Sequence, residues 1–186
     1  YPDIRVEIVS ETGSYQEMEE FLLNARVNCG FVRMPVDPAL NCIPLMRDPM
    51  LVVLPPDHPL AAQEEPITFA QLAHEPFLMP TEGNNYEIEQ LCKQYAFEPQ
   101  VAFTMHEDLS LLAMAENGLG YTILPSLLVN NYPHKAAVKR LETDPARLIG
   151  IATRANYTVS PLTTAFIDLV CQMAREYIPE QNRLLD

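Results

Sequence analysis

The sequence has no apolar run that approaches the roughly 20 residues a helix needs to cross a bilayer. This absence excludes a membrane-spanning helix. Basic residues are also scarce, because 12 Lys and Arg stand against 25 Asp and Glu, and the net charge is −13. Such an excess of negative charge repels polyphosphate, so we do not expect this segment to grip nucleic acid by itself. Small anions can still bind locally, at the N-termini of helices.

Metal-binding patterns of cysteine are missing as well. The four cysteines form no Cys-x-x-Cys pair and have no histidine nearby at a metal-ligand spacing. Each of them lies in an apolar run, which is typical of buried free thiols in a reducing compartment. We therefore expect no metal and no other cofactor. The residues are Cys29, Cys42, Cys92 and Cys171.

Known catalytic motifs are absent too. The chain contains no Gly-x-Ser-x-Gly, no phosphate-binding loop, no His-Glu-x-x-His and no Gly-x-Gly-x-x-Gly. Glu82 beside Glu87 and Glu89 offers paired carboxylates, but positions 87 and 89 fall on different sides of a helix. A solvated helix face is the plainer interpretation. These absences predict that the protein is not an enzyme.

What the chain does contain is an alternation of strand-like and helix-like segments, which favours α/β layers. Helices are expected to begin at Ser14 and Thr68, each with a capping box, and further helices after residue 85, at residue 109, after Pro125 and at Ser160. The last helix is expected to turn an apolar stripe inward: Phe166, Leu169, Val170, Met173 and Tyr177. Strands are expected at residues 4–9, 28–33, 41–46, 50–54, 77–79, 101–105, 120–124, 137–141 and 147–153.

A rigid turn follows the apolar strand at residues 50–54. Pro55, Pro56 and Pro59 forbid a helix and remove three amide donors, so the chain must leave the sheet in extended form. His58 lies inside this turn and is expected to be structural. Because the alternation of elements restarts after Leu54, we expect two α/β units joined by a crossing strand.

Two loops carry hydroxyl or amide side chains and a glycine just ahead of a helix. They are residues 10–14 and 81–85. Free backbone amides at helix starts favour a carboxylate or a similar small anion, although both loops can equally serve only as helix caps. Ligands in open α/β sheets bind beyond the carboxyl ends of strands, so we expect the working site in a cleft between the two units.

Several segments resemble the effector-binding domain of LysR-type transcriptional regulators. Residues 54–61, Leu-Pro-Pro-Asp-His-Pro-Leu-Ala, look like the middle of that domain, together with residues 67–73 and Pro76-Phe77. Residues 116–125, Glu-Asn-Gly-Leu-Gly-Tyr-Thr-Ile-Leu-Pro, look like its late glycine-rich turn, strand and proline. Residues 1–4, 97–101 and 160–166 match in the same order, so the resemblance covers nearly the whole chain.

The resemblance implies an α/β fold like that of type 2 periplasmic binding proteins, with two Rossmann-like subdomains joined by crossing strands. Residues 1–54 would form the N-terminal part of subdomain I and the first crossing strand, and residues 55–124 would form subdomain II. Residues 125–186 would make the second crossing and return to subdomain I with the C-terminal helix. The implied function is sensing of a small metabolite in the cytoplasm; the alternative is an extracytoplasmic solute-binding protein of the same fold.

The family also implies partners. Its regulatory domain follows a winged helix-turn-helix domain that binds DNA, and it begins with a strand and a helix ahead of the Tyr-Pro pair. Neither is expected in this sequence, which starts at Tyr1-Pro2 without a visible secretion signal. We expect a homodimer through the regulatory domain, a tetramer at full length, DNA contact only through the N-terminal domain, and no membrane.

Carried over residue by residue, the resemblance implies an effector cleft built from both subdomains. Thr12, Ser14 and Thr81 are the residues we expect to form direct hydrogen bonds. Arg33 would pair either with an effector carboxylate or in an ordinary salt bridge, and His106 would either contact an anion or be structural. The whole set is Glu11, Thr12, Gly13, Ser14, Phe31, Arg33, Thr81, Glu82, Gly83, Asn84, Met105, His106, Tyr121 and Thr122.

Overall fold

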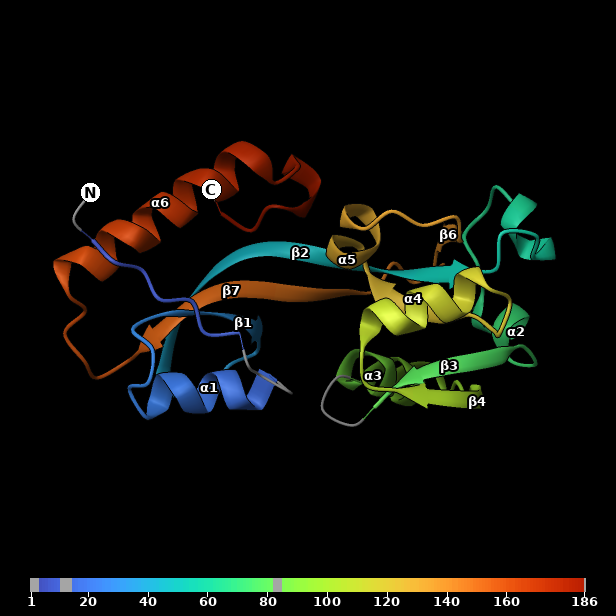
Figure 1. Cartoon of the computed structure of the whole chain (residues 1–186), viewed down its shortest axis with the longest axis horizontal. Coiled ribbons are helices and arrows are strands. Elements are labelled where there is room, and N and C mark those ends of the chain that lie inside the picture. Colours follow the sequence, from blue (N-terminus) through green and yellow to red (C-terminus); the bar gives the residue numbers. More distant parts are fainter. Residues whose placement is uncertain (1–3, 11–14, 82–84, 186) are drawn as a thin grey trace.

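The computed structural model describes residues 4–10, 15–81 and 85–185. Two lobes lie side by side along the long axis of the molecule, and the long strands β2 (Leu40–Leu54) and β7 (Ala146–Arg154) run from one into the other (Figure 1). The first lobe contains α1 (Tyr15–Leu23), β1 (Gly30–Met34), α6 (Pro161–Tyr177) and the short η2 (Glu180–Asn182).

The second lobe contains the elements between the two long strands. They are η1 (Pro59–Ala62), α2 (Phe69–Leu72), β3 (Pro76–Pro80), α3 (Tyr86–Tyr95), β4 (Gln100–Met105), α4 (Asp108–Glu116), β5 (Thr122–Pro125), α5 (Ser126–Asn131) and β6 (Ala137–Arg140). Most lie within a few residues of their predicted positions.

Strand β2 belongs to both lobes. Its first part pairs antiparallel with β7, up to the pair Pro49 and Ala146, and its last part pairs with β5 and β6. The sequence predicted two separate strands here, at residues 41–46 and 50–54, and this prediction is wrong. The missing amides of the prolines are accommodated without a break, because the register shifts just after Pro44 and Pro49 lies where the pairing passes from β7 to the other strands.

Helices α1 and α6 cover opposite faces of the sheet in the first lobe (Figure 1). Neighbouring residues of β7 point to these two faces, as the strand period requires. Ala152 packs with Leu22 of α1, and Ile151 packs with Cys171 of α6. The first lobe therefore has one apolar cluster on each side of its sheet.

The inward face of α6 differs in part from the prediction, because Val170 packs toward the sheet as predicted but most of the stripe does not. Leu169, Met173 and Tyr177 are 52%, 49% and 70% exposed, whereas Cys171 and Ala174 are buried. Two apolar stripes run side by side along this helix, and the stripe with smaller side chains lies on the sheet. Periodicity located the apolar side of the helix but did not decide which stripe faces inward.

The strand predicted at residues 4–9 does not form. Residues 4–10 have no regular secondary structure, and Val6 and Ile8 are 64% and 85% exposed. Alternation of apolar and polar residues only says which face of a strand would be buried. A strand also needs a neighbour for its backbone hydrogen bonds, and no described strand pairs with this segment.

The proline turn after β2 has the structural role predicted for it. Pro59 starts η1, and His58 Nδ1 accepts a hydrogen bond from the amide of Leu60 at 3.2 Å. On its other side, His58 Nε2 lies 3.5 Å from the Glu75 carboxylate. The capping box at Thr68 is also present, since its hydroxyl accepts from the amide of Gln71 at 3.3 Å.

The four cysteines are free, as predicted, but only Cys171 is buried and the other three are half-buried. Burial raises the pKa of Cys29, of Cys42 and of Cys92 above the ordinary thiol value. In the part of the chain that the structure describes, no helix is both long and apolar enough to cross a membrane.

Candidate functional site

Three of the predicted residues of the second lobe meet at the carboxyl ends of β3 and β4. These strands are parallel, so the residues that follow them lie at the same edge of the sheet. Thr81 Oγ1 lies 3.0 Å from His106 Nδ1, and the amide of Thr81 donates to the carbonyl of Met105 at 3.0 Å. The structure thus brings Thr81, Met105 and His106 together. Glu82, Gly83 and Asn84 lie outside the described residues.

Arg33 reaches from the first lobe to the second. Its Nη1 lies 3.4 and 3.5 Å from the two carboxylate oxygens of Glu87 in the first turn of α3, and its guanidinium lies 4.0 Å from the ring centre of Tyr86. The side chains of Arg33 and Glu87 are only 16% and 12% exposed. Of the two roles weighed for Arg33, the ion pair between the lobes is the one this structure contains.

Sequence reasoning missed Glu87. The prediction placed it on a solvated helix face with Glu89, and this is correct only for Glu89, whose side chain is 45% exposed. An acidic residue in the first turn of a helix is favoured by the helix dipole, which was the available signal. Its partner, Arg33, lies on β1, more than 50 residues earlier in the chain, and no local sequence pattern identifies such a distant partner.

A buried carboxylate joins the two crossing strands. Asp48 of β2 is fully buried and accepts hydrogen bonds from Arg147 Nε at 2.8 Å, Ser126 Oγ at 2.8 Å and the amide of Leu127 at 2.9 Å. A buried charge is tolerated only when it is paired and its lone pairs are satisfied, and both conditions hold here. Asp48 therefore links both crossing strands to the start of α5.

Asp108, in the first turn of α4, lies in the same electrostatic neighbourhood. Burial raises the pKa of its carboxyl, and the nearby Glu87 raises it further, while Arg147 and His106 act in the opposite direction. Charged and polar groups from both lobes and from both crossing strands therefore gather where the lobes face each other. Such a cluster can orient a small polar ligand.

Two predicted residues of the described chain, Tyr121 and Thr122, are not gathered at this place. Phe31 is 52% exposed on β1. Tyr121 and Thr122 belong to the core instead, since they are 1% and 0% exposed and the Thr122 hydroxyl donates to the carbonyl of Leu78 at 3.0 Å. Their strand was located correctly, but its burial on both faces leaves no side for a ligand. The four predicted residues of the first loop, Glu11, Thr12, Gly13 and Ser14, lie outside the described part of the chain.

Among the described residues, no group of three or more His, Cys, Asp or Glu side chains is arranged to hold a metal ion. Two of the carboxylates named above are held in ion pairs instead, Glu87 by Arg33 and Asp48 by Arg147.

The sequence also matches a known protein family. Residues 1–175 match the family model described as the LysR substrate binding domain. The probable HTH-type transcriptional regulator LrrA of Synechococcus elongatus is 31% identical over 180 residues, which cover 94% of this chain and 58% of LrrA. The chain thus spans little more than half the length of this curated relative.

Solved structures agree on the fold. The regulatory domain of Synechocystis PCC6803 CcmR, in complex with 2-PG, matches 95% of this chain and 86% of its own with a TM-score of 0.85 at 20% identity. The BenM effector binding domain with its effector benzoate matches 96% of this chain and 83% of its own, with a TM-score of 0.81 at 21% identity. The predicted class, an α/β fold like that of type 2 periplasmic binding proteins, is confirmed.

Proposed function

Because the chain belongs to the LysR substrate-binding domain family, we propose that it binds a small-molecule effector between its two lobes and thereby controls an attached winged helix-turn-helix domain. The observation that carries the proposal is the ion pair between Arg33 of the first lobe and Glu87 of the second. A ligand that changes this contact changes the relation between the lobes. To shift an equilibrium between two arrangements, the effector must bind one of them more tightly than the other.

We propose a small carboxylate as the class of effector. Arg33 and the Thr81–His106 pair supply hydrogen-bond donors at the facing edges of the lobes. The Arg33–Glu87 distances of 3.4 and 3.5 Å exceed the roughly 2.8 Å of a good charge-assisted hydrogen bond, so a ligand carboxylate can approach the guanidinium more closely than Glu87 does. The benzoate bound by BenM is a ligand of this class.

The predicted loop residues complete this proposal. Thr12 and Ser14 would contribute hydroxyls from the first lobe and Glu82, Gly83 and Asn84 would contribute the loop after β3. We also propose that the boundaries between the subdomains lie at residues 54 and 124. The end of the long strand β2 at Leu54 supports the first boundary.

The proposed partners follow from the family. We propose a cytoplasmic homodimer through this domain, a tetramer at full length, and DNA contact through the winged helix-turn-helix domain alone. The net charge of −13 supports the last point, since this chain repels polyphosphate. The relatives are HTH-type regulators rather than enzymes, and they lend nothing to the alternative of a solute-binding protein.

A thermal-shift screen against small aromatic and aliphatic carboxylates tests the proposal. A carboxylate present at 100 times its dissociation constant stabilises the folded chain by about 2.7 kcal/mol. We expect the best hit to lose about ten-fold in affinity in Arg33→Gln and about three-fold in Thr81→Val, because these changes remove a charged and a neutral hydrogen bond.

Thr104→Val is the matched control, since Thr104 is an exposed residue of β4. It should bind the same carboxylate with unchanged affinity. If a carboxylate bound the wild-type chain, Arg33→Gln and Thr81→Val with equal affinity, the assignment of the cleft would be wrong. If no carboxylate bound at all, the proposed class of effector would be wrong.

A further inference from the structure

The chain after α6 folds back onto the crossing strand β2. Ile178 ends the helix, Pro179 prevents its continuation, and the following residues return between α6 and β2 (Figure 1). Ile178 and Leu185 pack against the apolar cluster that contains Leu45 of β2. We call residues 178–185 the tail segment.

The tail segment meets β2 where the pairing of this strand is irregular. Pro44 pairs with Gly150 and Met46 pairs with Ile149, so Leu45 is an extra residue, a β-bulge. A bulge bends its strand and leaves one residue outside the regular ladder. Because Leu45 is only 4% exposed, its carbonyl cannot rely on water and needs a donor from the protein.

The tail segment supplies that donor. The amide of Leu184 donates to the carbonyl of Leu45 at 3.0 Å, and Arg183 forms an isolated antiparallel bridge with Met46. Strand β7 pairs with β2 along the other edge of the same stretch. The bulge is therefore held between β7 on one edge and the tail segment on the other.

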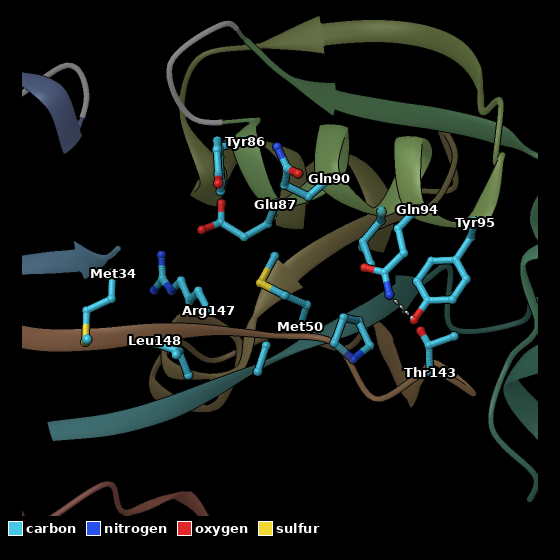
Figure 2. Close-up of a pocket in the computed structure, with 13 residues that line it drawn as sticks. Met34, Met50, Tyr86, Glu87, Gln90, Gln94, Tyr95, Thr143, Arg147 and Leu148 are labelled. Atoms are coloured by element: carbon cyan, nitrogen blue, oxygen red, sulfur yellow. Dashed lines mark hydrogen bonds between the residues drawn. The ribbon is translucent and has the colours of Figure 1, made fainter. Parts of the chain in front are cut away.

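The position of the bulge determines how the floor of the cleft is built. Just beyond it, Arg47 pairs with Leu148 and Asp48 pairs with Arg147. Arg147 and Leu148 line the hollow of about 390 Å³ between the lobes, opposite Glu87 of α3 (Figure 2). Since successive side chains of a strand point to opposite faces, a slip of β2 by one residue would turn Asp48 away from Arg147.

One contact of the tail segment is incomplete. Arg183 Nη2 donates to the carbonyl of Ile178 at 3.0 Å, but Arg183 Nε is buried and has no hydrogen-bond partner among the described residues. A buried donor without a partner costs stability. The tail segment should therefore open more easily than the sheet on which it lies.

We propose that the tail segment is a conformational switch of the cleft. While it is docked, it fixes the bulge of β2 and with it the positions of Arg147 and Leu148, and its release allows the bulge to move. Any consequence for an effector rests on the proposed function, because it requires a ligand in the cleft. The consequences for the bulge and for the lining of the cleft do not require a ligand.

Hydrogen exchange of two variants tests the hold on the bulge. Leu184→Pro removes the amide donor, whereas Leu184→Ala keeps it and only shortens a side chain that is 38% exposed. We expect the amides of residues 45–48 to exchange about ten-fold faster in Leu184→Pro than in Leu184→Ala. Strand β1, at the far edge of the same sheet, should exchange equally in both, whereas a general loss of stability would accelerate both strands.

Methyl resonances of methionine test the link to the cleft. Met34 and Met50 line the cleft, and Met114 packs in the core of the second lobe. With ¹³C at the methionine methyl groups, we expect Leu184→Pro to shift the resonances of Met34 and Met50 relative to Leu184→Ala. The resonance of Met114 should stay in place.

Equal exchange of residues 45–48 in the two variants would show that the tail segment does not hold the bulge. Unchanged resonances of Met34 and Met50 would show that the bulge is not coupled to the cleft. Either result overturns the proposal. If both tests succeed and no carboxylate binds the chain, the proposed function fails while this inference stands; if a carboxylate binds and both tests are negative, the reverse holds.

Discussion

Arg147 Nε lies 2.8 Å from Oδ2 of Asp48, and this contact ties β7 to β2 at the point where both strands pass between the lobes. The carboxylate of Asp48 is completely buried and is also held by Ser126 and the amide of Leu127. No other described carboxylate bonds to both crossing strands and to a helix of the second lobe.

Replacing Asp48 by asparagine should therefore destabilise the chain markedly. Asp48→Asn keeps the shape of the side chain but removes the buried ion pair with Arg147, at a cost of about 3 kcal/mol. For a chain of this size the melting temperature should fall by about 6–12 °C. Calorimetry checks this value. Asp168→Asn, at an exposed position of α6, is the control and should change the melting temperature by less than about 2 °C.

Two glycines near the end of α4 should respond very differently to alanine. Gly120 has φ of +151°, and a Cβ there would overlap with the carbonyl oxygen of Pro76, whereas Gly118 has φ of +80° and open space around it. We expect Gly118→Ala to cost about 1 kcal/mol of strain and Gly120→Ala to cost more than about 3 kcal/mol. Urea denaturation of both variants measures the difference. If both variants lost the same free energy of unfolding, β3 and β5 would have to be able to move apart at this contact.

Asp108 should make stability depend on pH in an unusual direction. Its folded-state pKa is raised, chiefly by burial, so the folded chain binds this proton more tightly than the unfolded chain. The contribution is stabilising below the unfolded pKa of about 3.9 and is lost as the pH rises through the raised folded pKa. Asp108→Asn should therefore melt higher than the wild-type chain at pH 7, and the gap should shrink as the pH falls toward 4.

The pH series needs a surface reference. Asp57→Asn, in the exposed part of the proline turn, should follow the wild-type melting curve throughout. A gap between Asp108→Asn and wild type that widens at low pH would contradict the sign of the shift.

The cysteine thiols should react slowly while the chain is folded. Burial raises the pKa of three of them and so lowers the fraction of reactive thiolate, and Cys171 is only 8% exposed. At pH 7.5 we expect iodoacetamide to modify native Cys29, Cys42 and Cys92 at least about ten-fold more slowly than the same residues in urea. Mass spectrometry of the peptides gives each rate. A native thiol that reacts as fast as the unfolded one would rule out protection by burial.

Local sequence patterns predicted the elements well, and the reason is that most of their signals are local. The capping box at Thr68 and the Ser160-Pro161 helix start involve residues only three positions apart, and both are present as predicted. The proline turn was also predictable, because a proline has no amide donor and restricts the backbone wherever it occurs in the chain. The strand at residues 4–9 failed because its formation depends on a pairing partner that is not a local property.

The site was harder to predict, since it depends on which distant segments meet. Thr81 and His106 were named from the family resemblance, and the structure places Thr81 Oγ1 3.0 Å from His106 Nδ1. Asp48 was not named, although it lies between two prolines in a strand where a charge is unexpected. The adjacent charges of Arg47 and Asp48, between two apolar segments, were the available hint that a buried partner existed.

The pairing of Pro49 with Ala146 has a consequence for how the chain can be rearranged. Residues 50–145 depart from one strand and return on the strand beside it, so their two ends are separated by only about 5 Å. Topologically, the second lobe is an insertion at the tip of a β-hairpin. A segment with such close ends can be exchanged between related chains as a unit. Each exchange would replace one wall of the proposed effector cleft, while the pairing of β2 with β7 keeps its register.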